Sequence, residues 1–177
     1  QKKMMIKIII ADDHPVVRSG LRALLSSRSD FEVVGEADNG EEAVALAKET
    51  TPDIVLMDLS MPVLDGVGAT ERITAEVPGT KVVVLTMHDD PDRTRAALVA
   101  GAVGYLTKGT SFDDVFDTLE RAHAGEEVLS PKLAATMLRT AEEEDPTKEL
   151  LSDRQREILQ MIADGLSTKQ AARELGI

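Results

Sequence analysis

Short apolar runs alternate along the first 125 residues with longer stretches in which apolar side chains recur every three or four positions. The runs are rich in β-branched residues and predict strands, whereas the recurring pattern predicts helices. The first strand is predicted at residues 6–11 and the first helix begins near Pro15, with Val17, Leu21 and Leu24 on one side. The remaining strands are predicted at 31–35, 54–57, 81–86 and 103–107, and the remaining helices at 41–49, 66–76, 91–100 and 112–124.

Several of these strands are apolar at every position instead of at every second one. Continuous apolar strands are typical of sheets that are covered by helices on both faces, and such sheets are usually parallel. The sequence therefore predicts an α/β fold with a five-stranded parallel sheet over residues 4–126.

A different organisation follows this region. Residues 127–149 are predicted to be a linker, with a helical stretch at 132–141 and an acidic segment at 142–147. Ser152 and Gln155 have the spacing of a capping box at the start of a helix that Gly165 ends, and a second helix is predicted at 168–175. Residues 150–177 are therefore expected to be part of a small all-α unit.

Charge separates the two regions. The chain has a formal net charge of −12, and residues 1–149 hold 16 Lys/Arg against 28 Asp/Glu, while residues 150–177 hold four of each. Such an acidic region repels a phosphate backbone, which argues against nucleic acid as its partner but leaves DNA open for residues 150–177. The chain has no Cys and no apolar run of bilayer length, so we expect a cytoplasmic protein without a membrane anchor.

Polar side chains stand at the carboxyl ends of four predicted strands, where open parallel sheets bind their ligands. Asp12 and Asp13 follow the first strand, Asp58 the third, Thr86 ends the fourth and Lys108 follows the fifth. Alone, each acid could be an ordinary helix cap, Thr86 a strand residue and Lys108 a solvated charge. Their joint placement at one edge favours a functional site.

Three converging carboxylates repel one another unless a cation compensates them, and Mg²⁺ binds such oxygen ligands. Asp13 and Asp58 are expected to be direct ligands, and Asp12 to act through water. A carboxylate nucleophile, a hydroxyl and an ammonium beside Mg²⁺ suit phosphoryl transfer, with Asp58 as the acceptor.

Four segments together resemble the receiver domain of two-component response regulators: Asp12-Asp13, residues 58–66, Leu85-Thr86 and residues 104–108. This resemblance implies a flavodoxin-like fold, phosphorylation of Asp58 by the phosphohistidine of a sensor histidine kinase, and Mg²⁺ as cofactor. By the same resemblance, Asp12, Asp13, Asp58 and the backbone carbonyl of Ser60 hold the metal, and Thr86 and Lys108 bind the phosphoryl group. Tyr105 is then the aromatic switch residue, whose ring rotates inward when Thr86 moves toward the phosphoryl group. Many receivers have Pro after this Lys, preceded by a cis bond, whereas this chain has Gly109.

Residues 151–177 resemble the start of a LuxR-type helix-turn-helix, which together with a receiver gives the NarL/FixJ arrangement. The resemblance implies a transcription regulator that forms a homodimer on phosphorylation. It binds DNA only in its full-length form, because the recognition helix follows Ile177 in the family. The alternative is a helical hairpin that merely packs on the first domain.

Two other functions with a similar fold fit less well. A haloacid-dehalogenase-type phosphatase also uses Mg²⁺ and an Asp nucleophile, but it needs a second Asp where this chain has Ser60. A flavodoxin-like FMN carrier needs a Ser/Thr- and Gly-rich loop after the first strand, where this chain has Asp12, Asp13, His14 and Pro15. We therefore expect no enzyme activity beyond the chain's own phosphorylation and dephosphorylation. His14 and His88 are expected at the rim of the site, not among the Mg²⁺ ligands.

Overall fold

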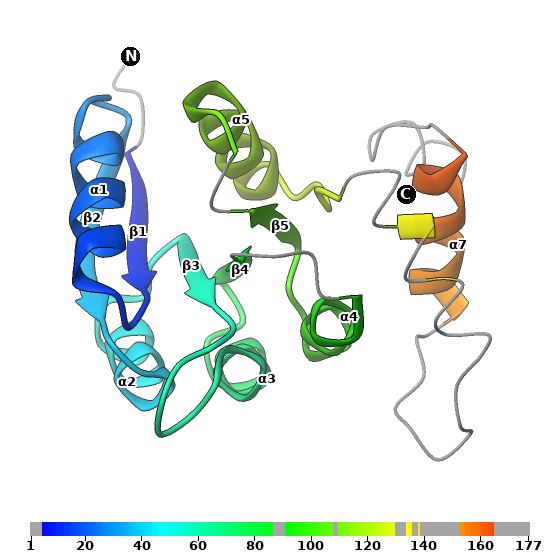
Figure 1. Cartoon of the computed structure of the whole chain (residues 1–177), viewed down its shortest axis with the longest axis horizontal. Helices are drawn as coiled ribbons and strands as arrows, with labels where there is room; N and C mark the ends of the chain where they lie inside the picture. Colours follow the sequence, from blue (N-terminus) through cyan, green and yellow to red (C-terminus); the bar gives the residue numbers. More distant parts are fainter. Residues whose placement is uncertain are drawn as a thin grey trace.

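The computed structural model describes residues 5–86, 91–107, 110–129, 134–135, 138 and 153–164. Within them, strands and helices alternate as the hydrophobic pattern predicts (Figure 1). The strands are β1 (Ile6–Ala11), β2 (Phe31–Ala37), β3 (Ile54–Asp58), β4 (Lys81–Thr86) and β5 (Gly104–Thr107). The helices are α1 (Pro15–Ser26), α2 (Gly40–Thr50), α3 (Gly66–Glu76), α4 (Pro91–Ala100), α5 (Phe112–His123) and α7 (Asp153–Ala163).

The five strands form one parallel sheet in the order β2-β1-β3-β4-β5. This is the flavodoxin-like order, in which the chain reverses its direction of winding between β1 and β3. The prediction of a five-stranded parallel sheet is confirmed. The middle of the sheet is fully buried, with Ile8, Ile9 and Ile10 of β1 each 0% exposed, which is why these strands have no polar alternation.

Helices cover both faces of the sheet with separate apolar clusters. Residues of α2, α3 and α4, among them Val44, Ile73 and Ala97, pack on one face against Ile9 and Val55. On the other face, residues of α1 and α5 pack against the neighbouring strand positions. That second cluster includes Leu25, Phe116, Leu119, Ile8, Ile10, Leu56 and Leu85.

Short side chains begin several of these helices. Asn39 accepts a hydrogen bond from the backbone N–H of Glu42 at the start of α2, and Ser111 does the same for Asp114 at the start of α5. Asp65 caps α3 through the N–H of Gly68. These caps satisfy N–H groups that have no partner within the helix, so the loops at the carboxyl edge of the sheet end at defined positions.

The segment after α5 runs beside the edge strand β5. Val128 forms a parallel bridge with Gly104, and its carbonyl accepts a hydrogen bond from the N–H of Tyr105 at 3.1 Å. This pairing covers backbone groups that an edge strand would otherwise expose.

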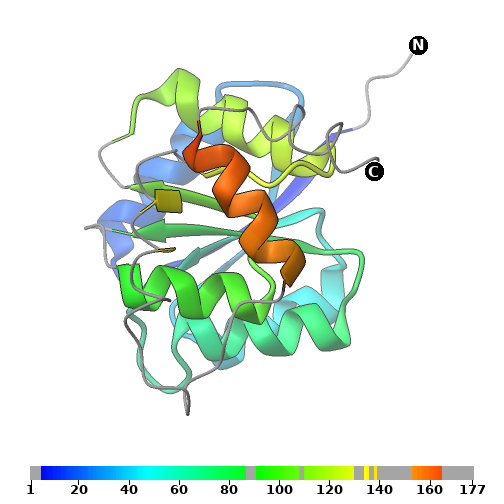
Figure 2. The same cartoon turned by 90° about the vertical axis from the view of Figure 1, so that its right-hand side faces the viewer.

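Helix α7 lies beyond β5 and crosses the space between α4 and α5 (Figure 2). Its apolar side packs on α4 and on part of the linker, in a cluster made of Leu98, Ala134, Leu138, Ile158, Leu159 and Ile162. We call this set of residues the α4–α7 cluster. Ala134, Ala135 and Leu138 are helical, as predicted for 132–141. The acidic segment 142–147 and the predicted helix 168–175 lie outside the described residues, and the domain boundaries at 126 and 149 stay predictions. No helix of the described part of the chain is long and apolar enough to cross a membrane.

Candidate functional site

The acidic residues singled out by their position meet at the carboxyl ends of β1 and β3. These strands are neighbours, and Ala11 is in register with Met57, so Asp12 and Asp58 occupy equivalent places at the same edge. This edge is also the point where the winding of the sheet reverses, which is where open α/β sheets bind ligands.

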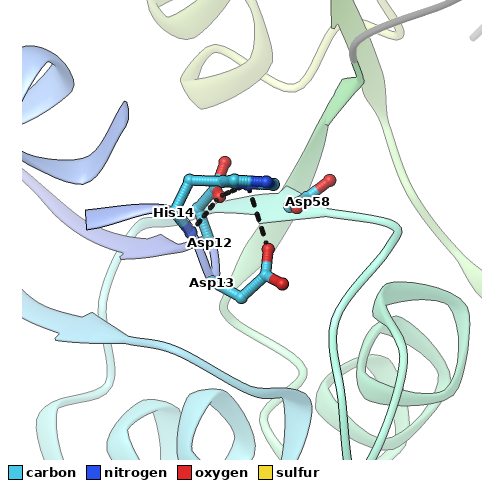
Figure 3. Close-up of side chains that lie close together, drawn as sticks. All are labelled: Asp12, Asp13, His14 and Asp58. Atoms are coloured by element: carbon cyan, nitrogen blue, oxygen red, sulfur yellow. Dashed lines mark hydrogen bonds and ion pairs between the residues drawn. The ribbon is translucent and has the colours of Figure 1, made fainter. Parts of the chain in front are cut away.

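Asp12, Asp13 and Asp58 lie together with His14 (Figure 3). One ligand atom from each of the four side chains lies within 4.8 Å of the others. Asp12 and Asp58 are 1% and 4% exposed, whereas the side chain of Asp13 is 33% exposed. The structure therefore brings together the three carboxylates that sequence reasoning grouped, two of them buried and one partly exposed.

His14 contacts both Asp12 and Asp13. Its Nδ1 is 2.9 Å from Asp12 Oδ1 and 3.1 Å from Asp13 Oδ1, and its backbone N–H donates to Asp12 Oδ1 at 2.8 Å. The imidazole, 58% exposed, therefore lies directly beside two of the acids. His14 lies beside the acids with an exposed side chain, and its expected place at the rim of the site stays a prediction. His88 lies outside the described residues.

The donor set fits a hard divalent ion. All three acids offer carboxylate oxygens, which Mg²⁺ prefers over nitrogen ligands. Asp13 Oδ1 is buried and, within the described part of the chain, accepts no hydrogen bond, although it makes the ion-pair contact with His14. This oxygen is therefore available to a metal if the exposed imidazole moves aside.

The loop after Asp58 is tightly held against the end of β3. The N–H of Ser60 donates to Asp58 Oδ1 at 3.3 Å, and the N–H of Gly66 donates to the carbonyl of Leu59 at 3.1 Å. A Cβ at Gly66 would collide with the backbone carbonyl of Asp58, so the start of α3 can approach the acid only because residue 66 is Gly.

The same loop contains a strained turn. Val63 has φ 70°, and the N–H of Leu64 donates to the carbonyl of Pro62 at 2.8 Å, which together form a γ-turn with a left-handed centre. For a β-branched residue this conformation costs about 1–3 kcal/mol. The Val63 side chain is 81% exposed, so packing of the side chain does not offset that cost.

Thr86 stands at the end of β4, one residue beyond Leu85, which is in register with Asp58. It lies opposite Thr107 of β5, the residue that precedes Lys108. Thr86 is thus at the same sheet edge as the acids, as predicted. Lys108 and its bond to Gly109 lie outside the described residues.

Tyr105 lies between two apolar clusters. Its ring packs against the apolar cluster on the sheet face that α2, α3 and α4 cover, and also against the α4–α7 cluster. The hydroxyl is buried, with no hydrogen-bond partner among the described residues. Burial raises the pKa of Tyr105 well above its ordinary value, and the negative charge of Glu127 adds to the effect.

Sequence reasoning missed Arg93 of α4. Its guanidinium donates to Ser60 Oγ at 2.5 Å and to the carbonyl of Leu59 at 2.7 Å. In the sequence, a single Arg near the start of a helix is indistinguishable from a solvated charge, so no local signal could have identified it.

Comparison with known proteins agrees with this geometry. The family model described as response regulator receiver domain matches residues 8–120, and the model described as bacterial regulatory proteins, luxR family, matches residues 149–177. The chain is 40% identical over 176 residues to the transcriptional regulatory protein LiaR of Bacillus subtilis, covering 98% of this chain and 83% of LiaR. It is 40% identical over 169 residues to the response regulator protein VraR of Staphylococcus aureus, covering 96% of this chain and 81% of VraR.

A solved structure shows the same likeness in three dimensions. The crystal structure of a LuxR-family two-component response regulator from Aurantimonas superposes with a TM-score of 0.71 at 37% identity, covering 77% of this chain and 97% of that one. The fold, the acidic cluster and these relatives lead to one conclusion. The chain belongs to the response regulators of two-component signalling systems, with a receiver domain followed by a LuxR-type DNA-binding region.

Proposed function

We propose that this response regulator accepts a phosphoryl group on Asp58 in a Mg²⁺ site, and that the modification controls a DNA-binding output. The observation that carries the proposal is the convergence of Asp12, Asp13 and Asp58 at one point of the sheet edge. A carboxylate buried beside two others needs a cation to remain ionised, and an ionised carboxylate is the form that can attack phosphorus.

Different residues are proposed to bind the metal, to accept the phosphoryl group and to bind its oxygens. Asp12, Asp13, Asp58 and the backbone carbonyl of Ser60 would hold Mg²⁺, which when bound neutralises charge on the transferring group. An oxygen of Asp58 attacks the phosphorus of a phosphohistidine, an O–P bond forms, the N–P bond breaks, and the imidazole nitrogen keeps the electron pair. Thr86 is proposed to donate its hydroxyl to a phosphoryl oxygen, and Lys108 to pair with another.

The partners proposed are a sensor histidine kinase as the donor, DNA in the full-length form, and a second copy of the phosphorylated chain. The contact of α7 with α4 supports control of the output, because α4 also reaches the loop after Asp58 through Arg93. Tyr105, which packs on the α4–α7 cluster, is proposed to reorient when Thr86 engages the phosphoryl group. A transcription regulator acts where the DNA is, so we place the protein in the cytoplasm. Apart from its own phosphorylation and dephosphorylation, no enzyme activity is proposed.

The test is incubation with Mg²⁺ and a small phosphodonor, followed by intact mass measurement of the wild type and of Asp58→Asn. We expect one added phosphoryl group on the wild type and none on the variant, because the amide keeps the shape of Asp58 but is not a nucleophile. Asp53→Asn is the matched control, since Asp53 lies at the opposite end of β3 and bonds the N–H of Lys7. Undiminished phosphorylation of Asp58→Asn would remove Asp58 from its role.

A further inference from the structure

Arg93 joins helix α4 to the loop that follows the proposed phosphoacceptor. Two nitrogens of its guanidinium donate to two successive residues, Nη1 to Ser60 Oγ at 2.5 Å and Nη2 to the Leu59 carbonyl at 2.7 Å. A planar guanidinium that binds two acceptors fixes their relative orientation, which a single ammonium does not.

We propose that Arg93 is a positioning residue that orients the Leu59–Ser60 segment for metal binding and ties it to α4. The Leu59 carbonyl accepts from Arg93 on one side and from the N–H of Gly66 on the other, so α4 and α3 together fix the orientation of this peptide. The Ser60 carbonyl is the next along the chain, and the proposed function assigns it to Mg²⁺. The metal-related part of this inference therefore rests on that proposed function.

The strain in the loop supports such a role. A left-handed Val63 is unfavourable on its own and persists only where surrounding contacts hold the backbone in place. Because the Val63 side chain is exposed, those contacts come from its neighbours in the loop. Next to Val63, the carbonyl of Leu64 accepts a hydrogen bond from the N–H of Gly40 at 2.9 Å, and the Leu64 side chain packs against the core. The two ends of the loop are held as well. At one end, Gly66 is packed against the backbone of Asp58. At the other, hydrogen bonds from Arg93 hold Leu59 and Ser60.

Helix α4 also contacts α7, the described helix of the DNA-binding region. Near the far end of α4, the carbonyl of Leu98 accepts a hydrogen bond from Gln155 Nε2 of α7 at 3.2 Å. The Leu98 side chain packs with Ile158 and Leu159 in the α4–α7 cluster. Helix α4 thus contacts the loop after Asp58 near one end and α7 near the other. If the loop moves and Arg93 moves with it, α4 shifts, and the surface against which α7 packs shifts too.

The test compares Arg93→Lys with the wild type. Lys keeps the positive charge but loses the two-pronged geometry, so any change reports orientation and not net charge. We expect Mg²⁺ affinity, measured by calorimetry with the metal alone, to fall about tenfold, the lower end of the loss seen for outer-shell partners of metal ligands. Hydrogen–deuterium exchange of residues 59–65 should accelerate, and the phosphorylation rate should recover in excess Mg²⁺ because the chemical groups are intact.

Two further variants separate this role from a general loss of stability. Arg72→Lys is the matched control, since Arg72 is also a half-exposed helical Arg but pairs with Glu41 of α2, away from the acids. It should leave Mg²⁺ affinity unchanged, while the thermal unfolding of both variants in EDTA stays similar. Ser60→Ala removes one of the acceptors that Arg93 binds in the described part of the chain, so its effect should be smaller and should not add to that of Arg93→Lys.

The outcomes distinguish this inference from the proposed function. If the wild type binds Mg²⁺ and is phosphorylated while Arg93→Lys behaves like Arg72→Lys, the positioning role is wrong and the proposed function stands. If the wild type binds no Mg²⁺, the proposed function fails, and the exchange rates then test only whether Arg93 holds the Leu59–Ser60 segment against α4. Faster exchange of residues 59–65 in metal-free Arg93→Lys supports it, and unchanged exchange overturns it.

Discussion

At the scale of single residues, Tyr105 combines a polar group with an apolar environment. Its hydroxyl is buried and, among the described residues, has no hydrogen-bond partner, while its ring packs on two clusters. An unsatisfied buried hydroxyl costs about 1–3 kcal/mol. The proposed reorientation of Tyr105 would change the surroundings of this hydroxyl, which has no partner among the described residues in the present state.

Tyr105→Phe should therefore raise the free energy of unfolding at neutral pH by about 1 kcal/mol. Above pH 10 the two proteins should diverge further. Burial raises the pKa of Tyr105 in the folded state above the value of about 10 in the unfolded state. The free energy of unfolding of the wild type is therefore unaffected by this titration below pH 10. Above pH 10 it falls by about 1.4 kcal/mol per pH unit until the folded-state pKa is reached, whereas that of Tyr105→Phe does not.

Urea unfolding of the wild type and of Tyr105→Phe between pH 9 and about pH 11 measures this difference. The chain has one Tyr and no Trp, so tyrosinate absorbance reports Tyr105 alone. The absorbance should appear only on unfolding. A tyrosinate band that develops near pH 10 in the folded protein would contradict the buried state of the hydroxyl.

At the scale of elements, the start of α3 is as close to β3 as a backbone permits. A Cβ on Gly66 would overlap the carbonyl of Asp58 and come within 2.7 Å of the Leu59 Cα, and neither backbone atom can yield without moving the acid. Gly66→Ala should cost about 2 kcal/mol or more, in the range of overpacked sites, and should slow phosphorylation because Asp58 is displaced.

Gly79→Ala is the control for this prediction, since a Cβ there meets nothing within 4 Å. That change should be neutral or stabilise by up to about 1 kcal/mol, because Ala has fewer conformations to lose on folding. Denaturant unfolding and the phosphorylation time course of both variants decide the matter. Equal behaviour of the two would show that the close approach at Gly66 is not required.

The sequence was sufficient for the elements of the first domain and for the acids, and insufficient for the contacts between elements. Strand ends in a parallel sheet lie at one edge, so Asp12, Asp13, Asp58 and Thr86 could be grouped from the alternation of elements alone. The α4–α7 cluster brings together Leu98 and Ile158, which are 60 positions apart (158 − 98), and nothing in the apolar pattern of α7 indicates which element it packs on. Arg93 was overlooked for a related reason, because its contacts with Leu59 and Ser60 are hydrogen bonds that no spacing encodes.

At the scale of the whole molecule, the cost of the acid site is part of the stability of the fold. The chain has a net charge of −12, and three of its carboxylates meet in one small volume. Without a metal, this concentration of charge destabilises the folded state, because Asp58 is far from Asp12 and Asp13 when the chain unfolds. A cation that binds only the folded state adds stability in proportion to the logarithm of its concentration.

Asp13→Asn separates these two contributions. In EDTA the variant should be at least as stable as the wild type, because the substitution removes one negative charge from the cluster while keeping the shape of the half-exposed side chain. At Mg²⁺ about one hundred times its dissociation constant, the wild type should gain about 2.7 kcal/mol and the variant much less. Asp113→Asn, an exposed acid on α5, should leave the Mg²⁺ response intact. Thermal unfolding of the three proteins with and without Mg²⁺ gives the comparison, and an equal gain by Asp13→Asn and wild type would mean that the ion stabilises the chain from a site that does not include Asp13.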